Sequence, residues 1–216
     1  MEIYPHVYFI RQMFVNLYLL VGEDGLVLID TGLKGSRARI LRAIQEAKST
    51  PADLKSILIT HADGDHYGGL ADLQQDTHAM AYANPIEAEA VRAGRSSRPL
   101  NPGGIQKVLF GLVAPLFKSQ AGRIDAALAE GQEFGVLGGL KVIATPGHTP
   151  GHTSLFSPSS GVLFAGDSIQ IVDGKPRPSG AGNTWNMARA EESYQMQMAL
   201  KPLLILAGHG SWPAGN

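Results

Sequence analysis

The chain has 216 residues with 18 basic and 19 acidic side chains, which gives a formal net charge of -1. This length allows one substantial core, and the near-neutral charge gives no reason to expect a nucleic-acid partner. The sequence has no cysteine, which excludes disulfides, thiol catalysis and thiolate metal ligands, so any metal must be held by histidine and carboxylate side chains.

We expect a single domain over residues 1–216, because apolar residues at 44% and charged residues at 17% are typical of ordinary soluble proteins. No apolar run is long enough to cross a bilayer, and the N-terminus lacks the order of basic, apolar and small residues found in a secretory signal. We therefore expect a cytoplasmic protein with no membrane partner.

The first part of the chain predicts an antiparallel meander followed by a helix and a strand. Apolar, β-branched and aromatic runs separated by turn residues predict strands at 6–10, 14–21 and 26–30. Apolar residues at helical spacing predict a helix over 36–48, and a buried strand is predicted at 56–60.

The middle of the chain predicts short helices at 69–75 and 85–92, with a strand at 79–83 between them. A loop rich in Gly, Pro, Arg and Ser covers 94–104, and apolar residues at helical spacing follow over 105–117. Three interpretations of this last segment stay open: a lid over a site, a helix packed on the core, or a face shared in a homodimer.

The last part predicts strands at 140–144, 153–157, 162–165 and 203–207, and a helix at 186–200. Across the whole chain, five predicted strands end in an aspartate or a histidine close to glycine. These residues are Asp30, His61, His148, Asp167 and His209. Because a sheet fixes the backbone where its strands end, we expect these side chains to converge on one site.

The richest of these strand ends is the stretch His61-Ala62-Asp63-Gly64-Asp65-His66, which offers four potential metal ligands within six residues. Imidazole and carboxylate together suit divalent transition ions. A single cluster of this kind is a weak signal, but its combination with the other strand ends favours a metal site.

These separated motifs, in this order, resemble the metallo-β-lactamase superfamily over nearly the whole chain. The resemblance implies an α/β fold, a four-layer αββα sandwich whose two mixed sheets lie back to back with helices outside. It also implies a metal site along one edge of the sandwich. The turn Pro146-Gly147-His148-Thr149-Pro150-Gly151-His152 looks like the glyoxalase II and lactonase branch of the superfamily.

The resemblance further implies a dinuclear centre, with Asp167 bridging two divalent ions. The residues for the first ion would be His61, Asp63 and His148, and those for the second would be Asp65, His66 and His209. Asp30 is expected to orient a ligand rather than to bind a metal.

Asp63 departs from the family pattern His-x-His-x-Asp-His, in which the second position is histidine. An aspartate can still bind a metal there, and we favour this role; the alternatives are that it caps the next helix or that it contacts the metal ligands without binding the metal. Its added negative charge favours harder ions such as Mn or Fe, whereas the remaining ligands fit zinc. We therefore expect zinc first, with iron and manganese as alternatives.

The chemistry implied is hydrolysis of a small-molecule ester, lactone or thioester by a metal-bound hydroxide, which is available at neutral pH because the ion lowers the pKa of its water toward about 7. Asp65 or Asp167 is expected to orient the hydroxide or to pass its proton to the leaving group. The alternatives are an iron-dependent oxygen-using enzyme similar to persulfide dioxygenases, a phosphodiesterase, and a non-enzymatic binding protein.

Several other residues near these motifs have simpler interpretations. His152 is expected to form a hydrogen bond at the start of a strand, and His6 and His78 are expected to be surface or packing residues. Tyr67 is expected either to reach the substrate or to pack in the core. The stretch Asn183-Thr184-Trp185 is a candidate wall of the pocket, with plain loop packing as the alternative.

Overall fold

Two β-sheets stack face to face in the computed structural model, which describes residues 1–98 and 119–212. The first sheet has the order β1-β2-β3-β4-β5-β6-β7. Its strands are β1 (Glu2–Tyr4), β2 (Val7–Gln12), β3 (Val15–Gly22), β4 (Gly25–Ile29), β5 (Leu54–Ile59), β6 (Met80–Ala83) and β7 (Ala126–Ala127). Strands β1 to β4 pair antiparallel, which confirms the predicted meander.

The second sheet has the order β15-β14-β11-β10-β9-β8. Its strands are β8 (Glu133–Phe134), β9 (Leu140–Ala144), β10 (Thr153–Ser157), β11 (Val162–Gly166), β14 (Leu204–Ala207) and β15 (Ser211–Trp212). A separate hairpin of β12 (Ile169–Val172) and β13 (Lys175–Pro178) follows β11.

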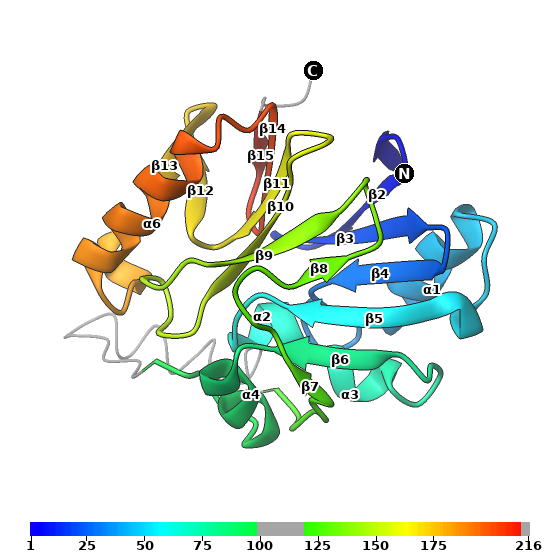
Figure 1. Cartoon of the computed structure of the whole chain (residues 1–216). Helices are drawn as coiled ribbons and strands as arrows, with labels where there is room; N and C mark the ends of the chain where they lie inside the picture. The colour runs from blue at the N-terminus through cyan, green and yellow to red at the C-terminus, as the bar shows by residue number, and fades with distance from the viewer. Residues whose placement is uncertain (99–118, 213–216) are drawn as a thin grey trace.

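Helices cover the outer face of each sheet, so the fold has the four-layer αββα order that was predicted (Figure 1). The helices are α1 (Arg37–Glu46), α2 (Gly64–Tyr67), α3 (Leu70–Leu73), α4 (Pro85–Arg92) and α6 (Met187–Ala199), with short 3₁₀ turns at Pro51–Asp53 and Ala181–Asn183. Residues of α1, α3 and α4 pack on the first sheet, and Tyr194 and Met198 of α6 pack on the second.

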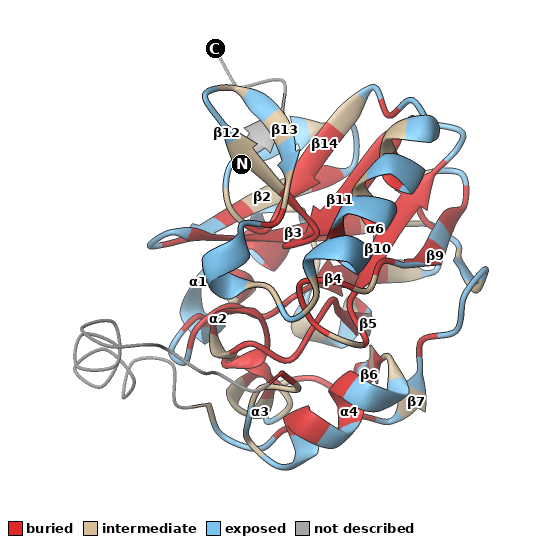
Figure 2. Cartoon of the chain, turned by 90° about the vertical axis from the view of Figure 1, so that its left-hand side faces the viewer, coloured by how far each residue is buried: buried red, intermediate tan, exposed pale blue. Residues whose placement is uncertain are grey.

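The alternation of side chains along each strand builds three apolar layers. In β3, Leu17 and Leu19 face the helices, whereas Tyr18 and Leu20 lie between the sheets. Central strands buried on both faces read as nearly continuous apolar runs. The buried sheets and the exposed outer side of α6 are visible in Figure 2.

Strand direction explains why the five predicted strand ends meet. Strands β4 and β5 are parallel, and so are β11 and β14. Strand β9 runs in the same sense as β11, because both are antiparallel to β10 between them. The ends of these strands, and the start of β10, therefore lie at one edge of the sandwich.

The structure also differs from the sequence-based elements in several places. The short strands β1, β7, β8, β12, β13 and β15 were not predicted, because two to four residues carry too little periodicity and depend on pairing partners. Part of the stretch His61 to His66, which was expected to be a turn, forms the one-turn helix α2. The helix expected over 69–75 is shorter than predicted and covers only Leu70–Leu73, as α3. The predictions for 105–117, and for most of the 94–104 loop, fall outside the described ranges.

Within residues 1–98 and 119–212, no helix is both long enough and apolar enough to span a bilayer.

Candidate metal centre

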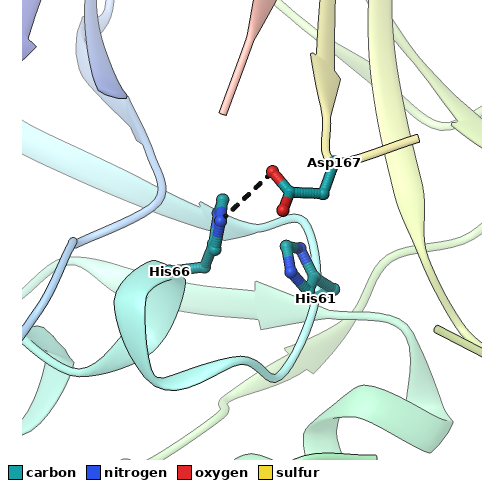
Figure 3. Close-up of side chains that lie close together, drawn as sticks. All are labelled: His61, His66 and Asp167. Atoms are coloured by element: carbon teal, nitrogen blue, oxygen red, sulfur yellow. Dashed lines mark ion pairs between the residues drawn. The ribbon is translucent and has the colours of Figure 1, made fainter. Parts of the chain in front are cut away.

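The predicted ligands converge at the edge where β4, β5, β9, β11 and β14 end. Figure 3 shows three of these side chains pointing toward one another. His61 comes from the loop before α2, His66 from α2, and Asp167 from the end of β11. The rings of His61 and His66 lie 4.0 Å apart between centroids, and His66 Nε2 is 3.3 Å from Asp167 Oδ1. Side chains separated by about a hundred residues thus share one small volume.

Asp30 fixes the orientation of His66. Its backbone adopts a left-handed conformation with φ of 59°, and its carboxylate accepts a hydrogen bond from His66 Nδ1 at 2.8 Å. The same carboxylate also accepts bonds from the backbone N–H and the hydroxyl of Thr60. Because Nδ1 of His66 donates a hydrogen bond to Asp30, Nε2 is the nitrogen that faces the candidate metal site. This is the orienting role predicted for Asp30.

Thr60 extends this network to His61. Its hydroxyl donates to Asp30 and accepts from Nδ1 of His61 at 3.0 Å. Nε2 of His61 is thereby directed into the site. One carboxylate at the end of β4 therefore sets the orientation of two imidazoles.

His209 is held by the opposite side of the sandwich. Its Nδ1 donates to the carbonyl oxygen of Phe14 at 2.8 Å, and the phenyl ring of Phe14 stacks against the imidazole. Its Nε2 lies 3.2 Å from Asp167 Oδ2 and 3.5 Å from Asp65 Oδ2. The turn between β2 and β3 thus contributes to the site, although the sequence analysis assigned this turn no role there.

Asp167 lies between the two groups of ligands. Its carboxylate faces His66 and His209, and Oδ2 is also 3.7 Å from His148 Nε2. Its backbone N–H donates to Nε2 of buried His152 at 3.0 Å, while Nδ1 of His152 bonds to Thr145. His152 therefore anchors the loop of Asp167, which confirms its predicted hydrogen-bonding role.

Backbone space beside Asp167 is also restricted. A Cβ atom at Gly208 would lie 2.3 Å from Asp167 Oδ1 and 2.6 Å from Cε1 of His66. Any side chain at this position would collide with Asp167 and His66, so the site requires glycine here.

Asp63 and His148 form the remaining side of the site. Oδ2 of Asp63 is 3.3 Å from Nε2 of His148 and 3.6 Å from Nε2 of His61. The same carboxylate accepts hydrogen bonds from Ser96 Oγ at 2.7 Å and from the guanidinium of Arg98. Its side chain makes no capping hydrogen bond to α2, so the structure does not support the capping alternative.

The donor atoms fit divalent cations. Three groups of side chains bring ligand atoms within 4.8 Å of one another: His61 with His66 and Asp167, His61 with Asp63 and His148, and Asp65 with His66 and His209. Among the described residues, several buried polar atoms of these side chains have no hydrogen-bond partner, namely His61 Nε2, His66 Nε2, His148 Nδ1 and Asp167 Oδ1. Unpartnered buried polar atoms each cost about 1–3 kcal/mol, and a bound cation would remove that cost wherever the unpartnered atom faces it.

The charges in the site reinforce one another. Burial opposes the charged form of His66, but the carboxylates of Asp167, Asp30 and Asp65 outweigh it and raise its pKa well above 6.5. Burial likewise opposes ionisation of Asp167, yet the charge of His66 and the contact with His209 hold its pKa well below its ordinary value. A site with this field attracts positive charge, whether a proton or a metal ion.

The pKa of Asp63 is also held well below its ordinary value. Burial acts to raise it, but the contacts with His148 and His61 and the charge of Arg98 act more strongly in the opposite direction. Burial is the main cause of the lowered pKa of His148, which leaves that imidazole neutral and able to bind a metal.

Glu87 is a supporting residue that sequence reasoning missed. It lies in the first turn of α4 and is fully buried. Its carboxylate accepts from the backbone N–H of Ala62 at 2.7 Å, from the hydroxyl of Thr149 at 2.8 Å and from the backbone N–H of Gly151 at 2.8 Å. The side chain of Glu87 thus links the loop of His61 to the loop of His148. The sequence did not indicate this role, because a glutamate in the first turn of a helix is usually exposed.

A cavity of about 360 Å³ opens beside the ligands. It is lined by Asp63, Gly64, Asp65, Tyr67, Gly94, Arg95, Ser96, Arg98, Asp167, Gly182 and Asn183. Of the predicted wall, only Asn183 belongs to this lining. Trp185 is half exposed, and its backbone N–H holds the carbonyl of His148. Tyr67 packs within the core and also lines the cavity, so both interpretations of this residue stay open. His6 and His78 are exposed, as expected of surface residues.

The sequence comparison agrees with this architecture. A family profile described as Metallo-beta-lactamase superfamily matches residues 10–209. The chain belongs to this superfamily. The match runs from β2 to His209, and it therefore covers every ligand proposed above.

Two relatives are similar to the chain in sequence, and a solved structure is similar to it in fold. The Bacillus subtilis uncharacterized protein YobT is 32% identical over 207 residues, covering 92% of this chain and 84% of that protein. The probable metallo-hydrolase YflN of the same organism is 30% identical over 202 residues, covering 85% and 75%. A solved Cronobacter sakazakii metallo-beta-lactamase with a HARLDQ motif shares the fold, with a TM-score of 0.71 at 24% identity and coverage of 97% and 80%.

Proposed function

We propose that this protein is a metal-dependent hydrolase that cleaves a small ester, lactone or thioester. The observation that carries the proposal is the convergence of buried, unpartnered imidazole and carboxylate atoms around Asp167 beside a cavity of small-molecule size. Most members of the superfamily are metal-dependent hydrolases, and one relative is named a probable metallo-hydrolase.

Two ligand sets would hold the ions, as the resemblance implies. His61, Asp63 and His148 form the first position, Asp65, His66 and His209 the second, and Asp167 faces both. Bound divalent ions lower the pKa of a coordinated water toward about 7 and polarise a carbonyl oxygen. Zinc fits the imidazoles best, and the carboxylates leave iron and manganese as alternatives.

The two aspartates proposed for catalysis differ in their surroundings. Asp167 is buried among imidazoles that keep it ionised, which suits a residue that holds cations. Asp65 lines the cavity, and its only close ion-pair partner within the described chain is Nε2 of His209 at 3.5 Å. Asp65 is therefore the better placed of the two to orient a water molecule and to carry a proton to the leaving group.

The size of the cavity supports a small substrate. About 360 Å³ lies at the lower end of the range for small-molecule sites, and its lining mixes glycine with polar side chains. The turn Pro146-Gly147-His148-Thr149-Pro150-Gly151-His152 also resembles the glyoxalase II and lactonase branch, whose substrates are thioesters and lactones. We therefore rank lactones and thioesters above phosphodiesters.

The test is turnover of lactone, thioester, aryl ester and phosphodiester panels before and after chelation, and after addition of Zn, Mn or Fe. We expect chelation to abolish activity and one of these ions to restore it. His66→Gln should lose activity, whereas the exposed His78→Gln is a matched control and should not. Full activity after complete metal removal would refute the proposal.

The second candidate is an iron-dependent oxygen-using enzyme, and the buried carboxylate of Asp63 is the observation that favours it. Protein from iron-replete cells would then contain iron and consume oxygen with a thiol or persulfide substrate. Absence of iron in that protein, together with hydrolysis supported by zinc, would exclude this candidate.

A further inference from the structure

Asp63 faces a buried cation as well as the proposed first metal position. Oδ2 accepts a hydrogen bond from Arg98 and lies within 3.6 Å of the facing nitrogens of His148 and His61. The side chain of Arg98 is only 7% exposed, and that of Asp63 is 12% exposed. Ser96 binds the second oxygen, so one short segment after α4 supplies two donors to this carboxylate.

The charge of Arg98 matches the charge that Asp63 adds. In the family pattern this position is a histidine, which is neutral when it binds a metal. An aspartate adds one negative charge to the three carried by Asp30, Asp65 and Asp167, and Arg98 adds one positive charge. A guanidinium stays protonated at every relevant pH, so this compensation is permanent.

We propose that Arg98 is a positioning residue that shares the carboxylate of Asp63 with the first metal position, and that it makes this position the weaker of the two. The inference rests on the proposed metal site. The second position differs, because the outer nitrogens of His66 and His209 are bound by a carboxylate and a carbonyl oxygen rather than by a cationic side chain.

Two physical effects act in the same direction. A guanidinium that donates a hydrogen bond to Oδ2 of Asp63 reduces the electron density that this oxygen can donate to a metal ion. A fixed positive charge in a poorly hydrated site also repels a second cation nearby. Without an ion, however, the same guanidinium pairs with the carboxylate of Asp63 and holds it beside His61 and His148. Arg98 therefore stabilises the metal-free protein while it lowers the affinity of the first position.

The test measures metal affinity and thermal stability rather than turnover. Calorimetric titration of the metal-free protein with Zn²⁺ should show two sites of unequal affinity. Arg98→Met should increase the affinity of the weaker site by about tenfold or more, and should lower the Tm of the metal-free protein by roughly 5–10 °C, because Asp63 loses its buried partner.

Matched variants separate this role from simple packing. Arg189→Met is the control, because Arg189 is exposed, pairs with exposed Glu192 on α6 and does not line the cavity, so neither quantity should change. Asp63→His alone should weaken the first site, since it leaves Arg98 buried beside the cations, and Asp63→His with Arg98→Met should restore tight binding. If Arg98→Met does not fold without metal, Arg98→Lys should give a smaller shift in the same direction.

The outcomes distinguish this inference from the proposed function. If the parent protein binds no metal, the proposed function itself fails. If it binds metal but Arg98→Met leaves both affinities unchanged, or weakens the first site, only the role of Arg98 is wrong. One ion in the parent and two in Arg98→Met would support the inference, and one ion in both would overturn it.

Discussion

The two halves of the candidate metal centre are built in different ways. Around the second position, His66 and His209 each have their outer nitrogen fixed by one strong acceptor, Asp30 and the carbonyl of Phe14. Around the first position, His148 Nδ1 is buried with no hydrogen-bond partner in the described part of the chain, and Asp63 also accepts hydrogen bonds from Ser96 and Arg98. The sheets therefore orient His66 and His209 of the second position, whereas a segment outside the sheets holds Asp63 of the first.

Asp167 links the two halves, so its loss should have the largest effect. Asp167→Asn keeps the shape but removes the charge that faces His66, His209 and His148. We expect metal content to fall at both positions and turnover to drop by about a thousandfold. The exposed Asp173→Asn is the control. Metal content that stays at the parent level in Asp167→Asn would contradict a shared ligand.

Asp30→Asn should act mainly on the second position. Asparagine tolerates the left-handed backbone but cannot accept from His66 as a charged group. Loss of such an orienting carboxylate typically costs about 10–100-fold in metal affinity. Calorimetry should show this loss of affinity at the tighter site. Equal losses at both sites would indicate that the hydrogen bonds from Asp30 through Thr60 to His61 contribute as much to the first position as the bond to His66 contributes to the second.

The pH dependence of binding should also distinguish the halves. Because the pKa of His66 is raised well above 6.5, this imidazole holds a proton at neutral pH that an incoming metal must displace. Apparent affinity at the second position should therefore fall about tenfold for each pH unit as the pH is lowered below that pKa. The pKa of His148 is lowered, so binding at the first position should release fewer protons. Calorimetry in buffers of different ionisation enthalpy counts these protons, and equal release at both positions would contradict the difference.

Glu87→Gln should give the smallest effect, and it should act on the first half. The amide keeps one acceptor oxygen, so the donors on Ala62, Thr149 and Gly151 lose part of their partner. At about 1–3 kcal/mol for an unpaired buried group, Tm should fall by roughly 3–8 °C, with weaker metal binding at the first position. Glu89→Gln, exposed on the same helix, should change neither quantity.

The sequence predicted those parts of the molecule whose signal is local. Apolar strands that end in Asp or His placed Asp30, His61, His148, Asp167 and His209 correctly at one edge, because strand direction and pairing follow from the fold class. The wall residues Thr184 and Trp185 do not line the cavity, since loop side chains follow tertiary contacts that no spacing reveals.

The residues that sequence reasoning missed are the partners of the ligands. Glu87, Arg98 and the carbonyl of Phe14 come from distant segments, and each acts through one contact rather than through a motif. One signal was available: a buried aspartate at 63 requires a cation nearby. It did not say which arginine would supply that charge. The ligand assignments themselves stay predictions that metal binding must test.

The most direct test is anomalous diffraction from crystals soaked with zinc or manganese. We expect two peaks, one among His61, Asp63 and His148 and one among Asp65, His66 and His209, with Asp167 in contact with both. The first peak should be the less occupied at low metal concentration. Absence of any peak at this edge, or peaks formed by other residues, would contradict the proposed metal centre.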